Sequence, residues 1–156
     1  MAGNVEVGAP DWQKTHLKLY LSTDGADGHF VDFTRFGGLH DTPCLILKTT
    51  GRQSGEPKLV PLIYGEDGGN FVIVASRGGA PEHPAWFLNL EAKPTVEFQV
   101  IDKKYRGTAR IAESPERERL YAMMAQIYPP YIAYQAGTTR KIPVVVLEPQ
   151  TEIDHL

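Results

Sequence analysis

The chain has 156 residues, of which 42% are hydrophobic and 22% are charged, and its formal net charge is -3. This length and composition predict a single globular domain that buries its core without disulfides or metals. The negative net charge argues against a general nucleic-acid binder, because such proteins gain affinity by neutralising phosphates.

The amino-terminal segment predicts a lead-in followed by a short helix. Residues 1–10 lack the basic start and apolar core of a signal peptide, and no apolar run approaches the roughly 20 residues that span a bilayer, so we expect a cytoplasmic protein. From Asp11, taken as a helix cap, to Thr23, the residues Trp12, His16 and Tyr20 recur at helical spacing.

A glycine-rich segment, 24–40, then predicts a loop whose phenylalanines Phe30, Phe33 and Phe36 complete the core. The single cysteine, Cys44, excludes an intrachain disulfide, and its apolar neighbours indicate a buried, inert thiol.

From residue 43 onward the pattern predicts a mainly β fold. Strands are expected at 43–47, 58–64, 70–76, 95–101, 105–112 and 142–147. The glycine-rich joint 65–69 predicts a hairpin between the second and third strands, and Pro61 indicates an edge position. Short helices are expected at 83–92 and after Ser114, which we interpret as a cap, and the polar tail from 148 is expected to be loose. Six β segments joined mostly by hairpins predict an antiparallel sheet closed, or nearly closed, into a barrel.

Two glycine-punctuated loops carry cationic side chains. Gly51–Gly55 precedes one strand and Arg77-Gly78-Gly79 ends another, so backbone N–H groups can turn toward a ligand. Arg52, Lys58 and Arg77 supply charge-assisted donors suited to phosphate or carboxylate. If the two strands are neighbours, both loops flank one anion; the alternative is a pair of hairpin loops with solvated cations.

Other candidate residues also have structural interpretations. None of the histidines has the spacing of a metal motif, so no metal site is expected. Ser76 lacks the surroundings of a nucleophile. Tyr128, Tyr131 and Tyr134 recur at three-residue spacing and form either one wall of a cavity or part of the core. Trp86 shares a helix face with Asn89, and core packing is its default role.

Five segments in order resemble one family: TTGRxSGxPxxxPLIY, VIVASxGG, HPAWFLNLEAKPTV, YPPYIAYQ and IPVVVLEP. Across roughly residues 33–149 the chain resembles the deazaflavin-dependent nitroreductases of actinobacteria, the flavin/deazaflavin oxidoreductases of the A branch. The resemblance implies a split β-barrel, like that of FMN-binding proteins, that binds coenzyme F-420.

The resemblance also assigns roles to residues. It places the coenzyme's phosphate and glutamate tail at Arg52, Gln53, Ser54 and Lys58. It places the deazaflavin ring and its chain at Pro61, Ser76, Arg77, Gly78 and Gly79, backed by Trp86 and Asn89. The acceptor is expected at Tyr128, Tyr131, Tyr134, Ile63 and Trp12, with Ser76 and Tyr128 as catalytic hydroxyl donors. Ile63 stands where nitroimidazole-reducing members carry tyrosine.

These assignments imply hydride transfer from reduced F-420 to a quinone, an unsaturated lactone such as a coumarin-type compound (aflatoxin is one), or a nitroaromatic. Residues 1–22 are expected to form a lid over a split-barrel domain at 23–149, with 150–156 as a tail. The partner is then a small-molecule acceptor, with peripheral membrane contact if that acceptor is a menaquinone, and the protein is a monomer or a homodimer. Two alternatives remain: an FMN-dependent oxidoreductase of the same fold, and a non-catalytic carrier that sequesters F-420.

Overall fold

The structure is a computed structural model and describes residues 5–156. Its elements, in chain order, are α1 (Trp12–Ser22), β1 (Phe30–Val31), the 3-10 turn η1 (Thr34–Phe36), β2 (Thr42–Thr50), β3 (Pro57–Ile63), β4 (Gly65–Asp67), β5 (Asn70–Val74), the 3-10 turn η2 (Arg77–Gly79), α2 (Ala85–Ala92), β6 (Thr95–Val100), β7 (Lys103–Ile111), α3 (Glu116–Ile127), α4 (Pro130–Ala136) and β8 (Val144–Ile153).

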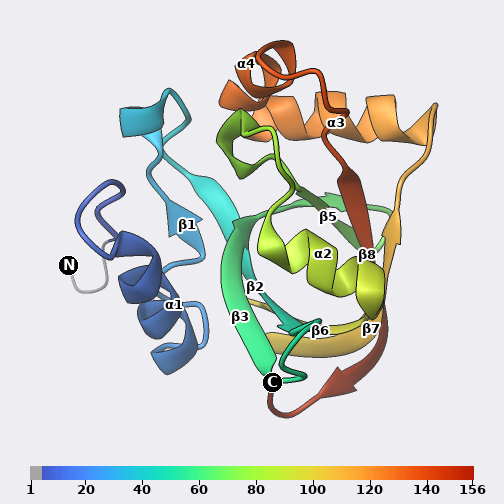
Figure 1. Ribbon diagram of the computed structural model, residues 1–156. Coiled ribbons are helices and arrows are strands. Elements are labelled where there is room, and N and C mark those ends of the chain that lie inside the picture. The colour runs from blue at the N-terminus through green and yellow to red at the C-terminus, as the bar shows by residue number, and fades with distance from the viewer. Residues whose placement is uncertain (1–4) are drawn as a thin grey trace.

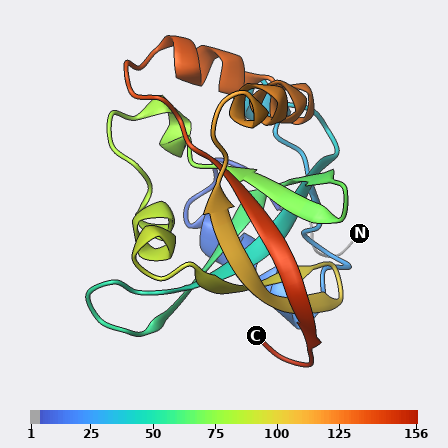
Figure 2. The same cartoon turned by 90° about the vertical axis from the view of Figure 1, so that its right-hand side faces the viewer.

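The strands form one antiparallel sheet that curls into a barrel (Figure 1). The order is β1-β2-β6-β7-β8-β5-β4, and β3 pairs with the other edge of β2. Figure 2 shows β7 and β8 side by side along most of their length, as their register requires. The expected mainly β fold with short helices is confirmed.

Two apolar clusters hold the fold together. One fills the barrel, where Leu47, Phe98 and Leu147 of the strands meet Phe87 and Leu90 of α2. The other packs the outside of β5 and β8 against α3 and α4 and includes residues such as Leu120, Met124, Tyr128 and Tyr131. Burial of aliphatic and aromatic surface of this kind is the main favourable term in folding.

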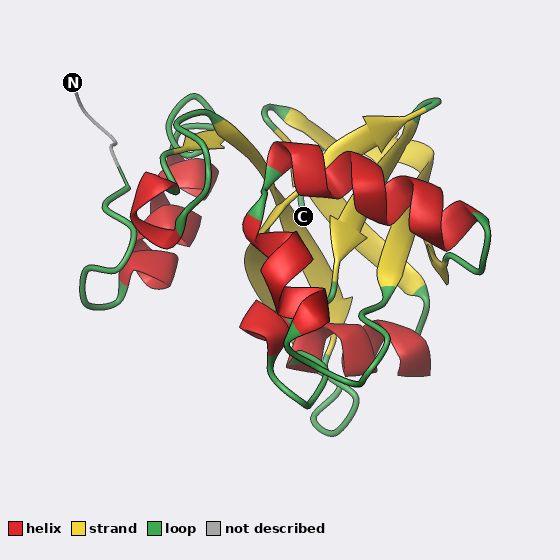
Figure 3. Cartoon of the chain, turned by 90° about the horizontal axis from the view of Figure 1, so that it is seen from above, coloured by secondary structure: helices red, strands yellow, loops and turns green. Residues whose placement is uncertain are grey.

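The helices cover different parts of the barrel. Figure 1 shows α2 against the opening of the barrel and α3 and α4 across one end. Seen from above in Figure 3, α1 and the loop after it stand to one side. Tyr20 anchors α1, because it is fully buried and its hydroxyl donates to the Cys44 carbonyl at 2.9 Å and accepts from the Ile101 N–H at 2.8 Å.

One strand pairing differs from the prediction. The strand expected at 58–64 pairs with β2, from Cys44↔Ile63 to Thr50↔Pro57, and does not pair with β5. The hairpin expected at 65–69 exists, but it joins the short β4 to β5 through Gly68 and Gly69, whose φ angles of 58° and 89° suit a tight turn. Pro61 lies on an edge strand, as predicted.

Several boundaries also differ. The segment expected to be a loose tail continues β8 as far as Ile153, because its backbone pairs with β7 whatever the polarity of its side chains. The segment expected to be a loop at 24–40 contains β1 and η1. Neither predicted cap acts as one: Asp11 makes no capping hydrogen bond, and the Ser114 hydroxyl accepts from Lys141.

Within the described part of the chain, no helix is long and apolar enough to cross a bilayer.

Candidate functional site

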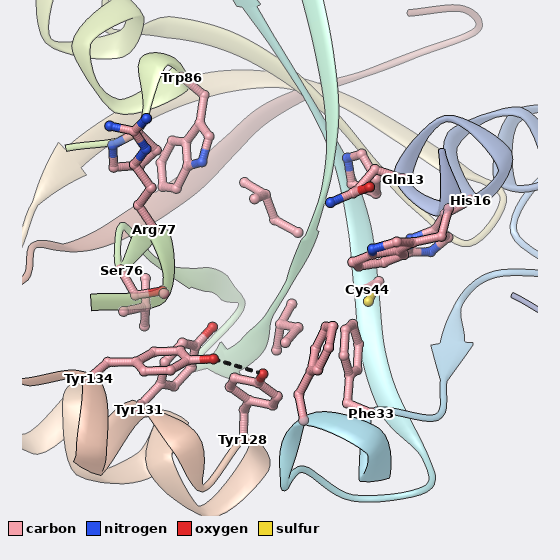
Figure 4. A pocket seen from close by; sticks show the side chains of 18 residues that line it. Gln13, His16, Phe33, Cys44, Ser76, Arg77, Trp86, Tyr128, Tyr131 and Tyr134 are labelled. Carbon is pink, nitrogen blue, oxygen red and sulfur yellow. Dashed lines mark hydrogen bonds between the residues drawn. The ribbon is translucent and has the colours of Figure 1, made fainter. Parts of the chain in front are cut away.

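A cavity of about 400 Å³ lies between α1, β3, η2 and α4. Figure 4 shows its opposite walls: Gln13 and His16 on one side, and Ser76, Arg77 and the tyrosines on the other. We call it the aromatic cavity. The residues that line it are Trp12, Gln13, His16, Phe33, Phe36, Cys44, Pro61, Leu62, Ile63, Val74, Ser76, Arg77, Gly78, Pro84, Trp86, Tyr128, Tyr131 and Tyr134.

Three tyrosines form one wall of the aromatic cavity. Tyr128 precedes α4, and Tyr131 and Tyr134 follow at three-residue spacing on the helix. The hydroxyls of Tyr128 and Tyr134 are 3.1 Å apart and hydrogen-bonded (Figure 4). Burial raises the pKa of both Tyr128 and Tyr131 well above its ordinary value of 10.0. These phenols therefore stay neutral near neutral pH and can donate a hydrogen bond into the cavity.

Helix α1 forms the facing wall. The Trp12 ring meets Phe33 and Phe36 edge-on at centroid distances of 6.0 and 6.3 Å. His16 is buried, and its Nε2–H donates to the Gly28 carbonyl at 2.8 Å. Desolvation lowers the pKa of His16, so the ring is neutral and its Nδ1 carries no proton. The expectation that all three phenylalanines complete the core is wrong for Phe30, which is 61% exposed, and for Phe36, which is 44% exposed and lines the cavity. Phe33 is buried as expected, and it also lines the cavity.

A second cavity, of about 370 Å³, lies between the β2–β3 loop and α2. We call it the cationic cavity, because Arg52 and Lys58 line it and none of its lining residues is acidic. The residues that line it are Gly51, Arg52, Gln53, Ser54, Lys58, Val60, Ala85, Trp86 and Asn89. Guanidinium, ammonium, amide and hydroxyl donors that converge on one space suit a phosphate or carboxylate ligand.

Asn89 fixes the β2–β3 loop from beneath. Its Oδ1 accepts from the Arg52 N–H at 3.2 Å and from Arg52 Nη1 at 3.0 Å, and its Nδ2 donates to Thr49 at 3.2 Å. Asn89 is 5% exposed, and both polar atoms of its amide are hydrogen-bonded to protein partners. Asn89 therefore orients the guanidinium of Arg52.

The β5–α2 connection borders the aromatic cavity with an unusual backbone. Arg77, Gly78 and Gly79 all have positive φ angles, 47°, 62° and 83°. For a non-glycine residue such as Arg77 this conformation costs about 1–3 kcal/mol. Ser76 and Gly78 line the cavity, whereas Gly79 packs against α4, where an added Cβ would lie 3.1 Å from the Cα and O of Tyr134.

The two cavities adjoin. Trp86 lines both, and β3 runs along both, with Lys58 and Val60 facing the cationic cavity and Pro61 to Ile63 facing the aromatic one. Together they fit an elongated ligand with a flat ring at one end and an anionic tail at the other. Arg77 lines the aromatic cavity and Arg52 and Lys58 line the cationic one, so the three cations do not surround a single space as the sequence suggested.

All but one of the expected site residues line one of these cavities; the exception is Gly79. Sequence reasoning missed the contributions of Gln13, Phe33 and Phe36. It placed His16 on the helix of the expected lid without a role at the site. It also missed Arg140, whose guanidinium binds the β5–α2 connection. Within residues 5–156 no cluster of three or more His, Cys, Asp or Glu side chains could hold a metal.

Comparison with known proteins gives a consistent result. A family described as F420H(2)-dependent quinone reductase matches residues 12–149. The F420H(2)-dependent quinone reductase Rv1261c of Mycobacterium tuberculosis is 38% identical over 137 residues, which cover 86% of this chain and 87% of that protein.

Solved structures agree in fold. One, described as an F420-H2 dependent reductase (FDR-A), is 44% identical with a TM-score of 0.64 and covers 68% of this chain and 94% of its own. Another, described as a domain-swapped dimer, is 39% identical with a TM-score of 0.66 and covers 86% of this chain and 94% of its own.

Proposed function

The chain belongs to the F420H(2)-dependent quinone reductase family, and from this premise we propose that it transfers a hydride from reduced coenzyme F-420 to a quinone in the aromatic cavity. It is an oxidoreductase whose cofactor is coenzyme F-420. The observation that carries the assignment of the site is the junction at Trp86, where an aromatic cavity meets a cationic one.

The chemistry of the cationic cavity matches the anionic part of the coenzyme. Arg52 and Lys58 would hold the phosphate and glutamate carboxylates, and Gln53 and Ser54 would add neutral donors. The ring would lie against residues that β3, the β5–α2 connection and α2 contribute, which are Pro61, Ser76, Arg77, Gly78 and Trp86. The open concavity along β3 leaves room for both parts.

When bound, the reduced coenzyme supplies a hydride, which is equivalent to two electrons and one proton. A quinone that accepts it becomes a hydroquinone anion and needs one further proton. Tyr128 and Ser76 present hydroxyl groups to the cavity, and each can donate to the oxygen on which negative charge develops. A preorganised donor of this kind stabilises the charged state more than the neutral quinone.

The proton enters from solvent by way of the tyrosine pair. Tyr134 is half-buried, and its hydroxyl contacts that of Tyr128 at 3.1 Å. Because burial keeps the pKa of Tyr128 high, this residue stays protonated and acts as a relay and donor, not as a phenolate base.

The shape of the aromatic cavity favours flat conjugated acceptors. Ile63, Phe33 and Trp12 supply apolar surface around the tyrosine hydroxyls, which suits the ring system of a naphthoquinone or a coumarin-type lactone. Nitroaromatics share the flat shape but spread the developing charge over a nitro group. Quinones place it on one oxygen within reach of a single hydroxyl donor, so quinones are the preferred class.

Exposed apolar side chains near the aromatic cavity support a lipid-borne quinone. Phe36 lines the cavity, Leu39 follows three residues later, and Ile132 lies between the tyrosines of α4; their exposed fractions are 44%, 46% and 65%. Exposed apolar side chains of this kind suit transient contact with a bilayer. Sedimentation with vesicles is expected to fall when Phe36 and Ile132 are both changed to serine, and equal sedimentation would contradict membrane contact.

Fluorescence titration tests the assignment of the site directly. Trp86 lines both cavities and Trp12 lines one, so binding of F-420 is expected to quench tryptophan emission more strongly than FMN at equal concentration. Anaerobic oxidation of F-420H2 with menadione is expected to follow. Tight binding without oxidation would point to the carrier alternative, and preference for FMN would contradict the cofactor.

A further inference from the structure

The β5–α2 connection, residues 75–84, has few backbone hydrogen bonds of its own to fix its shape. Within it, Gly79 N donates to Ser76 O at 2.9 Å and Ala80 N to Arg77 O at 3.1 Å. Two of the three consecutive residues with positive φ angles are glycines, which also adopt extended conformations readily, so the backbone alone does not hold this shape. The connection therefore depends on contacts from elsewhere to hold Ser76 and Gly78 at the aromatic cavity.

Arg140, in the link between α4 and β8, provides those contacts. Its Nε donates to Ala80 O at 2.9 Å, its Nη1 to Ala75 O at 3.1 Å, and its Nη2 to Ser76 O at 2.7 Å. Nη1 also lies 3.0 Å from His83 Nδ1, at the far end of the connection. One planar guanidinium thus binds the connection at its start, middle and end.

The charge of Arg140 has no acidic partner within 4.0 Å in the described part of the chain. Every partner on the β5–α2 side is a backbone carbonyl or an imidazole nitrogen. An arginine used for ion pairing has a carboxylate neighbour, as Arg110 and Arg119 do. Its geometry is that of a clamp on main-chain oxygens.

The other side of Arg140 is tied to the helix that carries the tyrosines. Gln135 of α4 donates from Nε2 to the Arg140 carbonyl at 2.9 Å. The Oε1 of Gln135 in turn accepts from Arg117 Nη2 at 2.6 Å and from the Ile142 N–H at 2.9 Å. The position of Arg140 is therefore fixed relative to Tyr131 and Tyr134 by short hydrogen bonds.

We propose that Arg140 is a positioning residue that holds the β5–α2 connection in the shape that receives the coenzyme and aligns it with the tyrosine wall. Arg140 lines neither cavity, so it acts through Ser76, Arg77 and Gly78. This inference rests on the proposed function, since the coenzyme is the ligand whose binding it controls. Without the clamp the connection opens, and part of the binding free energy is spent on ordering it.

The test compares Arg140→Ala with Lys141→Ala, the same loss of charge one residue along. Lys141 is exposed, and its side chain contacts Ser114 and Glu118 and no residue of the connection. Arg140→Ala is expected to weaken F-420 binding about tenfold, because binding must then order the connection. Lys141→Ala is expected to leave the affinity unchanged. Equal affinity of wild type and Arg140→Ala would overturn the proposal.

Hydrogen exchange on the cofactor-free protein supplies a second readout. Arg140→Ala is expected to raise amide exchange in residues 75–84 and not in β7, and millimolar guanidinium chloride is expected to restore both protection and affinity. Sodium chloride at the same concentration is expected to restore neither. Lost affinity with unchanged exchange and no rescue would overturn the clamp, because Arg140 would then act by direct contact.

Arg140→Lys covers the case in which the alanine variant does not fold. A lysine keeps the charge but cannot bind three carbonyls at once, so about threefold weaker binding at unchanged melting temperature is expected. Wild-type affinity in Arg140→Lys would overturn the proposal. If wild type and Lys141→Ala also fail to bind F-420, the proposed function fails, and this outcome is distinct from the failure of the clamp.

Discussion

Arg52 and Lys58 are the cations on which the cationic cavity depends. Replacing both with alanine is expected to weaken F-420 binding by about 2–4 kcal/mol, because each would lose a charge-assisted hydrogen bond to the coenzyme. Tryptophan fluorescence titration measures the change. Arg52 is already oriented by Asn89, so little side-chain ordering opposes its contribution.

The double variant Lys103→Ala with Lys141→Ala is the matched control. It removes the same charge from exposed positions that line neither cavity. Affinity is expected to stay at the wild-type value in this control. A comparable loss in both double variants would mean that net charge, and not the cavity, governs binding.

Tyr128 is expected to donate to the reacting oxygen. Tyr128→Phe keeps the ring and removes the hydroxyl, so the kcat for menadione reduction is expected to fall by about tenfold to a hundredfold with little change in F-420 affinity. Tyr105→Phe is the control, because it removes a hydroxyl from a tyrosine that lines neither cavity. An unchanged kcat in Tyr128→Phe would remove this hydroxyl from the mechanism.

At the scale of single residues, the sequence indicated the site best where chemistry and position were both unusual. Arg52 and Lys58 stand beside glycines in a polar loop, which is a poor place for core residues. Phe36 and His16 gave no such signal, because an aromatic ring looks the same in a core and in a cavity wall. Arg140 was missed because its partners lie about 60 residues away in the chain.

Among the elements, α1 contributes to the aromatic cavity and not to the cationic one. Trp12→Ala is therefore expected to raise the KM for the acceptor about threefold to tenfold and to leave the Kd for F-420 unchanged. Steady-state kinetics with menadione measure the KM of the variant. Titration of the variant with F-420, followed by the fluorescence of its remaining tryptophan, measures the Kd. This result would support α1 as a lid over the acceptor.

Leu21→Ala is the control on the same helix, since Leu21 is exposed and lines neither cavity. Point variants are preferable to deletion of residues 1–22, because that deletion would remove the fully buried Tyr20 and its bonds to β2 and β6. Equal acceptor kinetics in Trp12→Ala and wild type would contradict the lid.

Element types were easier to predict than element partners. Apolar runs marked β2 and β5, and alternating polar and apolar residues marked β6 and β7, since period and composition are local properties. The partner of β3 was not predictable in this way: the glycine-rich joint after it indicated a hairpin, yet only the three residues of β4 turn back onto β5. The extension of β8 escaped notice because pairing with β7 uses backbone groups.

For the molecule as a whole, two buried histidines predict how stability depends on pH. Burial lowers the pKa of His16 and of His29 below the ordinary 6.5. The unfolded chain then takes up these protons first, so their contribution to stability is complete above pH 6.5 and is lost as the pH falls below it. The slope is at most about 1.4 kcal/mol per pH unit for each histidine.

Denaturant unfolding between about pH 6.5 and 5.5 measures this effect. Carboxylates such as Asp32 and Glu116, whose pKa values are lowered from 3.8 and 4.5 mainly by hydrogen bonds from Thr34 and Arg110, lose their contribution only at lower pH. His16→Gln and His29→Gln are each expected to flatten the slope, and His155→Gln, at an exposed position, is expected to leave it unchanged. A flat wild-type profile in this window would contradict the assignment.

The position of Cys44 has a consequence for the survival of the protein during turnover. The residue is 1% exposed and borders the cavity in which quinones would react, and burial raises the pKa of its thiol well above 9.0. Quinones alkylate sulfur by conjugate addition, and the anion is the species that attacks. Kept in the protonated form, this sulfur is a poor nucleophile, so we expect quinones in the aromatic cavity to leave Cys44 unmodified over many turnovers.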